Sequence, residues 1–83
     1  MWYVYIIQGI DEKLYTGITT DLSRRLAEHN SGHGGKFTRF RGPFELRYQQ
    51  EVVSRSVALK REASIKKLSR TAKLDLILSG NRI

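Results

Sequence analysis

The sequence predicts an α/β (α+β) fold: a small sandwich in which helices cover a three-stranded sheet, in the order β-β-α-β-α-α. Two apolar runs rich in tyrosine and β-branched residues open the chain, and a stretch that alternates apolar and polar residues follows later. Three further stretches repeat apolar residues at helical spacing. With 83 residues and no cysteine, the chain is expected to form one domain, residues 1–83, that rests on apolar packing.

The first two strands are predicted over residues 2–7 and 14–19. Both runs favour strands, and the polar break between them has the length of a hairpin loop, so the pair is expected to be antiparallel. Tyr5 and Tyr15 lie in this hairpin, together with Tyr3. Their rings either fill a core or bring two hydroxyls side by side on one face.

A helix is predicted over residues 21–30, because Asp21 (or the threonine before it) can cap the first turn and a Ser-Gly pair follows the end. Leucines four residues apart mark its buried stripe. Arg25 and His29 lie at the edge of that stripe and are expected to face the sheet. Alternatively, the arginine extends past the stripe to solvent, and the histidine is a helix-end residue stabilised by the dipole.

Residues 31–43 are predicted to form a loop, because they contain four glycines and a proline. Lys36, Arg39 and Arg41 alternate there with two phenylalanines. Basic residues between aromatic ones suit a surface that contacts nucleic acid. The alternative is that the phenylalanines pack inward and the cations are only solvated.

A third strand is predicted over residues 44–51, with Phe44, Leu46 and Tyr48 on one inward face. A helix then begins after Ser54 or Ser56.

A last short helix is expected over residues 71–79, with Gly80 as its stop. In the helix before it, Glu62 lies within the mostly apolar arc, where it could pair with Lys66 four residues on.

The charge of the chain favours a polyanionic partner. Fifteen Lys and Arg against eight Asp and Glu give a formal charge of +7. Nucleic acid is the first candidate, ahead of an anionic membrane surface or ribosomal RNA. The uncharged N-terminal run ends at Asp11, too short to span a bilayer and without the features of a signal peptide. We therefore expect a soluble, cytoplasmic protein, a monomer or weak homodimer.

The unusual residues form a set with a shared chemistry: Tyr5, Tyr15, Arg25, His29 and Glu62. Phosphodiester hydrolysis needs an activated oxygen nucleophile, a cation on the phosphoryl oxygens and usually a hard metal ion. Arginine matches phosphate geometry, a carboxylate suits Mg²⁺, and tyrosine and histidine can orient or deprotonate water. Taken singly, each residue also has an ordinary structural explanation.

The order of these motifs resembles the GIY-YIG nuclease family. Val4-Tyr5, followed ten residues later by Tyr15-Thr16-Gly17, is similar to the paired signature of that family, although the first triplet lacks its Gly-Ile. The helix that carries Arg25 resembles the family's arginine helix, and the segment around Glu62 resembles its metal-binding helix. The loop with Thr38-Arg39 and Arg41-Gly42-Pro43 is similar to that of the small stand-alone bacterial members.

The resemblance implies a GIY-YIG endonuclease-like fold and a role for each residue. Tyr5 and Tyr15 would lie over the site, with Tyr5 helping water to act as the nucleophile. Gly17 would allow close backbone approach, Arg25 would stabilise the phosphate, and His29 would assist proton transfer. Glu62 would hold a single Mg²⁺ or Mn²⁺ ion, Lys66 would join the nucleic-acid surface, and Asn81 is a candidate for the family's later asparagine.

Three functions remain open at this point. The first is a metal-dependent endonuclease that cleaves DNA with low sequence specificity, in repair or processing, with a protein partner for targeting. The second is a non-catalytic nucleic-acid-binding module with the same fold. The third is a protein that docks an acidic partner through its basic helices. The Glu62 carboxylate within the apolar arc of its helix favours the endonuclease, because nucleic-acid binding alone does not require a carboxylate there.

Overall fold

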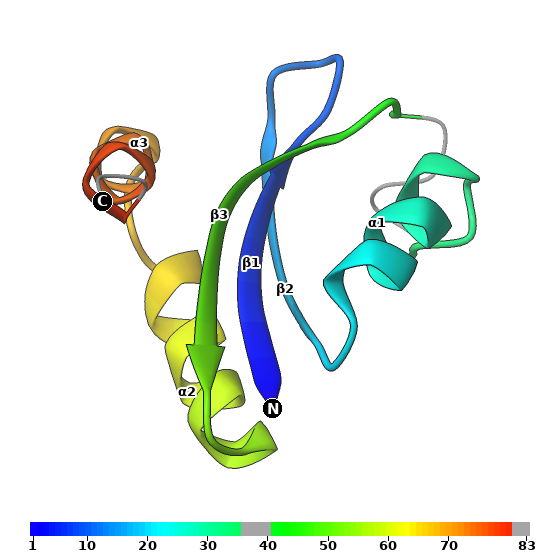
Figure 1. Cartoon of the computed structure of the whole chain (residues 1–83). Coiled ribbons are helices and arrows are strands. Elements are labelled where there is room, and N and C mark those ends of the chain that lie inside the picture. The colour runs from blue at the N-terminus through cyan, green and yellow to red at the C-terminus, as the bar shows by residue number, and fades with distance from the viewer. Residues whose placement is uncertain (36–40, 81–83) are drawn as a thin grey trace.

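The structure, a computed structural model, describes residues 1–35 and 41–80. The predicted order of elements is confirmed (Figure 1). The elements are β1 (Trp2–Gln8), β2 (Leu14–Thr19), α1 (Leu22–Asn30), β3 (Glu45–Val52), α2 (Arg55–Lys66) and α3 (Arg70–Gly80). Gly80 is the last helical residue rather than the stop after the helix.

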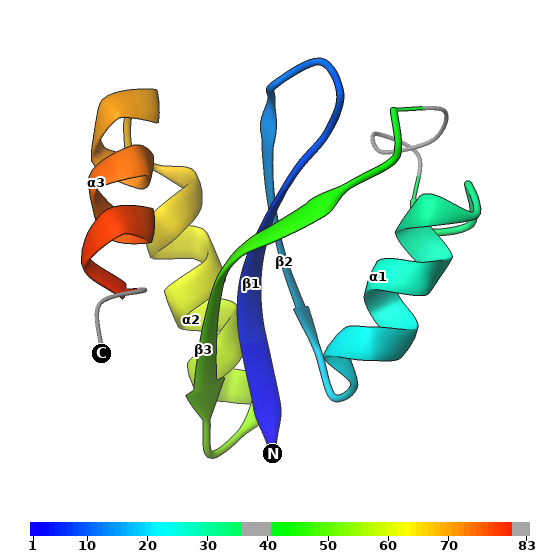
Figure 2. The same cartoon turned by 45° about the horizontal axis from the view of Figure 1, so that its top comes forward.

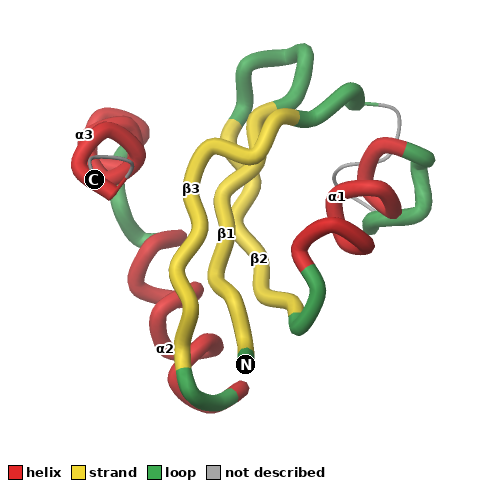
Figure 3. Tube along the Cα trace, viewed as in Figure 1, coloured by secondary structure: helices red, strands yellow, loops and turns green. Residues whose placement is uncertain are grey.

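The three strands form one antiparallel sheet in the order β2-β1-β3. The sheet is the middle layer of the molecule, with α1 on one face and α2 and α3 on the other (Figures 1 and 3). Because β2 lies at an edge of the sheet, its backbone is the border between the two helical layers. The predicted sandwich of a three-stranded sheet covered by helices is confirmed.

Each face of the sheet has its own core, because successive side chains of a strand point to opposite faces. Val4 and Ile6 of β1 lie in the core beneath α2 and α3 and are fully buried. Tyr5 and Ile7 lie in a smaller core with Phe44, beneath α1. Burial of one such aliphatic side chain contributes about 1.5–3 kcal/mol. The central strand therefore holds both layers together.

The prediction that Phe44, Leu46 and Tyr48 share one inward face was wrong. Tyr48 lies opposite Ile6, whereas Leu46 lies opposite Ile7, so β3 has one extra residue between them. Such a bulge shifts the pairing by one residue and turns the later side chains to the other face. Phe44 consequently packs beneath α1 and Tyr48 beneath α2 and α3.

A polar side chain caps the first turn of both α1 and α2. The Asp21 carboxylate accepts a hydrogen bond of 3.0 Å from the backbone N–H of Arg24, as the sequence predicted. Ser54, rather than Ser56, caps α2, because its hydroxyl accepts from the backbone N–H of Val57 at 3.2 Å. None of the helices in the described part of the chain is long and apolar enough to cross a membrane.

Candidate active site

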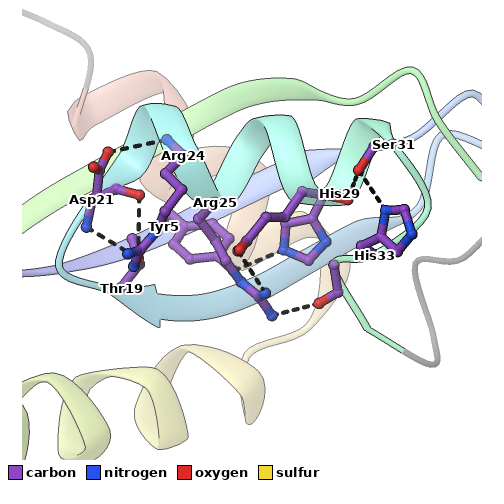
Figure 4. A network of polar contacts seen from close by, with 10 residues as sticks. Tyr5, Thr19, Asp21, Arg24, Arg25, His29, Ser31 and His33 are labelled. Atoms are coloured by element: carbon purple, nitrogen blue, oxygen red, sulfur yellow. Dashed lines mark hydrogen bonds and ion pairs between the residues drawn. The ribbon is translucent and has the colours of Figure 1, made fainter.

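The site is built around a contact between the central strand and α1. The Tyr5 hydroxyl lies 2.9 Å from Nε2 of His29, and the two rings meet edge to face (Figure 4). Only 4% of Tyr5 and 6% of His29 is exposed. The sheet-facing position expected for His29 is therefore confirmed, and its neighbour is the tyrosine of the first motif.

Burial favours the neutral form of both partners. Desolvation lowers the pKa of His29, and the nearby Arg25 guanidinium lowers it further. Desolvation raises the pKa of Tyr5, although the Arg25 guanidinium opposes that rise. A charged helix-end histidine is therefore not the state that this position favours. A hydroxyl and an imidazole that are both neutral and hydrogen-bonded can pass a proton between them.

Two glycines make room for this pair. Gly17 lies opposite Tyr5 in the sheet, and a Cβ atom there would lie 2.4 Å from the Tyr5 hydroxyl oxygen. A Cβ atom at Gly34 would lie 2.2 Å from Nδ1 of His29. Gly17 was predicted from its motif, whereas Gly34 was not, because its only signal in the sequence was its place in a glycine-rich loop.

Arg25 is held on the same side of the sheet as Tyr5. Its guanidinium donates to the Glu28 carboxylate at 3.2 Å and to the backbone carbonyl of Gly34 (Figure 4). These contacts fix the arginine beside the tyrosine rather than in open solvent. The predicted position of Arg25 at the edge of the packed face is confirmed.

Tyr15 belongs to a separate network. Its ring shares a face with Tyr5, but its hydroxyl donates to Oδ2 of Asp11 at 2.9 Å. Arg41 donates to the same oxygen at 3.2 Å. Desolvation raises the pKa of Tyr15, and the Asp11 carboxylate raises it further. The two tyrosine hydroxyls therefore have different partners, and Asp11 is a site residue that was not predicted from the sequence.

A cleft of about 490 Å³ joins these residues across the edge of the sheet. Tyr5, Tyr15 and Gly17 line it from the α1 side, and Glu62 lines it from α2 on the other side. The cleft therefore wraps around the β2 edge. Its lining residues are Tyr5, Leu14, Tyr15, Thr16, Gly17, Ile18, Arg25, His29, Gly34, Gly35, Glu62, Lys66 and Lys73.

Glu62 is the acidic residue among those that line the cleft. Its side chain is 19% exposed, and Lys66 lies 3.4 Å from its Oε2, so the pair expected at this spacing is present. No three His, Cys, Asp or Glu side chains gather into a metal cage within residues 1–35 and 41–80. Mg²⁺ does not require a cage, since it often binds through one or two carboxylates, waters and substrate phosphates. A partly shielded carboxylate in an open cleft fits that mode of binding.

The residues predicted to contact nucleic acid lie in different parts of the molecule. Lys66 lines the cleft. Arg41 ties its loop to the hairpin: its guanidinium donates to Asp11, and its carbonyl accepts from the backbone N–H of Ile10 at 3.1 Å. Lys36, Arg39 and Asn81 lie outside the described residues.

Comparison with known proteins agrees with this architecture. A family model described as the GIY-YIG catalytic domain matches residues 1–75. The UPF0213 protein of Natronomonas pharaonis is 49% identical over 75 residues, which are 90% of this chain and 88% of the relative. The UPF0213 protein of Staphylococcus saprophyticus is 46% identical over 78 residues, 94% of this chain and 95% of the relative.

Solved structures show the same fold. The solution NMR structure of the UPF0213 protein from Bacillus halodurans matches with a TM-score of 0.62 and 44% identity, and covers 98% of this chain and 88% of that chain. The resemblance seen in the sequence is therefore confirmed on both sequence and structure. This chain belongs to the GIY-YIG family, part of the GIY-YIG nuclease superfamily, and is similar over most of its length to UPF0213 proteins.

Proposed function

We propose that this protein is an endonuclease that hydrolyses DNA phosphodiester bonds with the help of one divalent metal ion. The observation that carries the proposal is the buried hydrogen bond of 2.9 Å between Tyr5 and His29, in a cleft that Arg25 and Glu62 also line. A proton relay, a phosphate-binding cation and a carboxylate are the three groups that the reaction needs.

The proton of the attacking water would leave through the neutral pair. Water gives a proton to the Tyr5 oxygen while Tyr5 gives its own proton to Nε2 of His29, so the tyrosine is neutral before and after the step. The oxygen of the water forms the new bond to phosphorus. The imidazolium, whose charge the phosphate offsets, then returns a proton to the departing sugar oxygen.

Arg25 would bind the non-bridging oxygens of the phosphate, where its planar fork stabilises the charge that builds up on them. Glu62 would hold Mg²⁺ or Mn²⁺, which when bound supplies further positive charge at those oxygens. Lys66 would bind the backbone beside the cleft. Such contacts carry no sequence information, so a protein partner would supply targeting, and affinity should fall steeply with salt.

The test is a cleavage assay with Mg²⁺ or Mn²⁺ on single-stranded, duplex and branched DNA. Tyr5→Phe should reduce the rate at least about a hundredfold, since positioned proton transfer contributes about 10²–10⁴-fold. Glu62→Ala should reduce it by a similar factor, because the charge that a bound metal ion would supply is lost. Tyr3→Phe and Glu51→Ala are matched controls, because those residues do not line the cleft. They should cleave at the wild-type rate.

Two outcomes would contradict the proposal. A wild-type protein that cuts none of these substrates with either metal is not an endonuclease. Equal rates for wild type, Tyr5→Phe and Glu62→Ala would place any cleavage outside this cleft. Circular dichroism of every variant checks that a lost rate is not a lost fold.

A further inference from the structure

A second hollow adjoins the cleft. It has a volume of about 230 Å³ and is lined by Lys13, Leu14, Tyr15, Arg70 and Lys73. Leu14, Tyr15 and Lys73 line both hollows, so the two form one continuous surface. Figure 2 shows the first turn of α3 at the same end of the molecule as the β1–β2 hairpin, and residues of both segments line this hollow.

The charges of the two hollows differ. The cleft contains Glu62, whereas the second hollow has three cations and no acidic residue among those that line it. In residues 1–35 and 41–80, no ion pair joins Lys13, Arg70 or Lys73 to a carboxylate. Three converging positive charges repel one another, and an anion placed between them would relieve that repulsion.

The local structure does not explain these cations either. Arg70 lies in the first turn of α3 and Lys73 directly after it, and that turn has no acidic residue. The helix dipole disfavours positive side chains at this end of a helix. The start of the helix therefore gives no structural reason for the positive charge of Arg70.

We infer that the second hollow binds the backbone phosphates that flank the cleaved one on the same nucleic-acid strand. Lys66 and Lys73 line the cleft, and Lys73 also lines the hollow together with Lys13. A strand whose phosphate is bound by Arg25 can therefore continue past Tyr15 into the hollow. The inference rests on the proposed function, because it extends that site. It predicts that a strand must extend past the cleft to bind with full affinity.

The test measures binding without cleavage. Fluorescence anisotropy in EDTA follows labelled single strands, from a dinucleotide to a dodecamer, over a salt series. One triple variant removes the charges of the hollow: Lys13→Gln, Arg70→Gln and Lys73→Gln. A matched triple variant removes three exposed charges that line neither hollow: Arg24→Gln, Lys60→Gln and Lys67→Gln.

The hollow variant should bind the dodecamer at least about tenfold more weakly. The slope of log K against log salt concentration should become shallower by about 2, since each of the three phosphate contacts on a single strand contributes about 0.7. Its affinity for the dinucleotide should fall much less, because Lys73 is the member of the triple that also lines the cleft. The control variant should keep most of both the affinity and the slope. Thermal unfolding of both variants checks their folds.

Equal weakening by the two triple variants would overturn the inference, because total charge would then explain binding. A mononucleotide or inorganic phosphate that competes as well as the dodecamer would also overturn it. Cleavage with Mg²⁺ is scored separately on wild type. If wild type cuts nothing but the hollow still governs strand binding, the hydrolysis proposal fails, and what stands is a strand-binding hollow beside a cleft that does not cleave.

Discussion

Replacing Gly17 by alanine tests the close packing of Tyr5 against β2. The added Cβ atom would lie 2.4 Å from the Tyr5 hydroxyl oxygen and 2.6 Å from Cζ. Ordinary contact begins at 3.4 Å, so the hydroxyl must move by about 1 Å. The ring is almost fully buried and its hydroxyl is held by His29, so it cannot move without losing that hydrogen bond.

The expected cost follows from two opposing effects. Overpacking of a buried site costs about 1–3 kcal/mol. Replacing a strand glycine by alanine returns about 0.5–1 kcal/mol, because glycine loses more freedom on folding. With the middle of each range, the free energy of unfolding should therefore fall by about 1 kcal/mol, and the midpoint of thermal unfolding by about 4–8 °C. A hydroxyl displaced by about 1 Å should also slow cleavage about a hundredfold.

Urea and thermal unfolding followed by circular dichroism measure the first effect, and the cleavage assay measures the second. The same Gly17→Ala change in a Tyr5→Leu background is the control. Leucine lacks the atoms that the new Cβ would strike, so the penalty should disappear there. A Gly17→Ala protein as stable as wild type, or an equal penalty in both backgrounds, would refute the packing argument.

Three further predictions concern protonation and capping. Burial lowers the pKa of His29, so the unfolded chain takes up a proton at a higher pH than the folded chain, and the free energy of unfolding should fall as the pH drops below about 6.5. Urea unfolding at several pH values should show a weaker pH dependence for His29→Gln. An equal pH dependence for the two proteins would contradict the assignment. Asp11→Asn should lower the pKa of Tyr15, because the carboxylate contributes to raising it. Ultraviolet titration of tyrosinate measures the pKa, and an unchanged titration would exclude the contact between Asp11 and Tyr15. Ser54→Ala should reduce the free energy of unfolding by about 0.5–2 kcal/mol, because its hydroxyl caps α2, whereas Ser56→Ala should have little effect; the reverse order would place the helix start at the second serine.

The local sequence was sufficient for the elements and for most of the site. The hairpin follows from two β-branched runs around a polar break, and the first helix follows from Asp21 at its start. The helical period by itself indicates that Arg25 and His29 face the sheet. These signals are contained within a few neighbouring residues, so the sequence alone could determine them.

Tertiary structure decided what depends on distant pairs. The bulge that separates Phe44 from Tyr48 arises where β3 pairs with β1, and no alternation within β3 indicates it. Arg41 meets Asp11 only because the hairpin and a loop 30 residues away come together. Glu62 lines the same cleft as the tyrosines, around the edge of β2, because an edge strand leaves a border where opposite helical layers meet. The sequence alone indicated which residues are candidates for the proposed chemistry, whereas their partners depend on contacts that local periodicity does not encode.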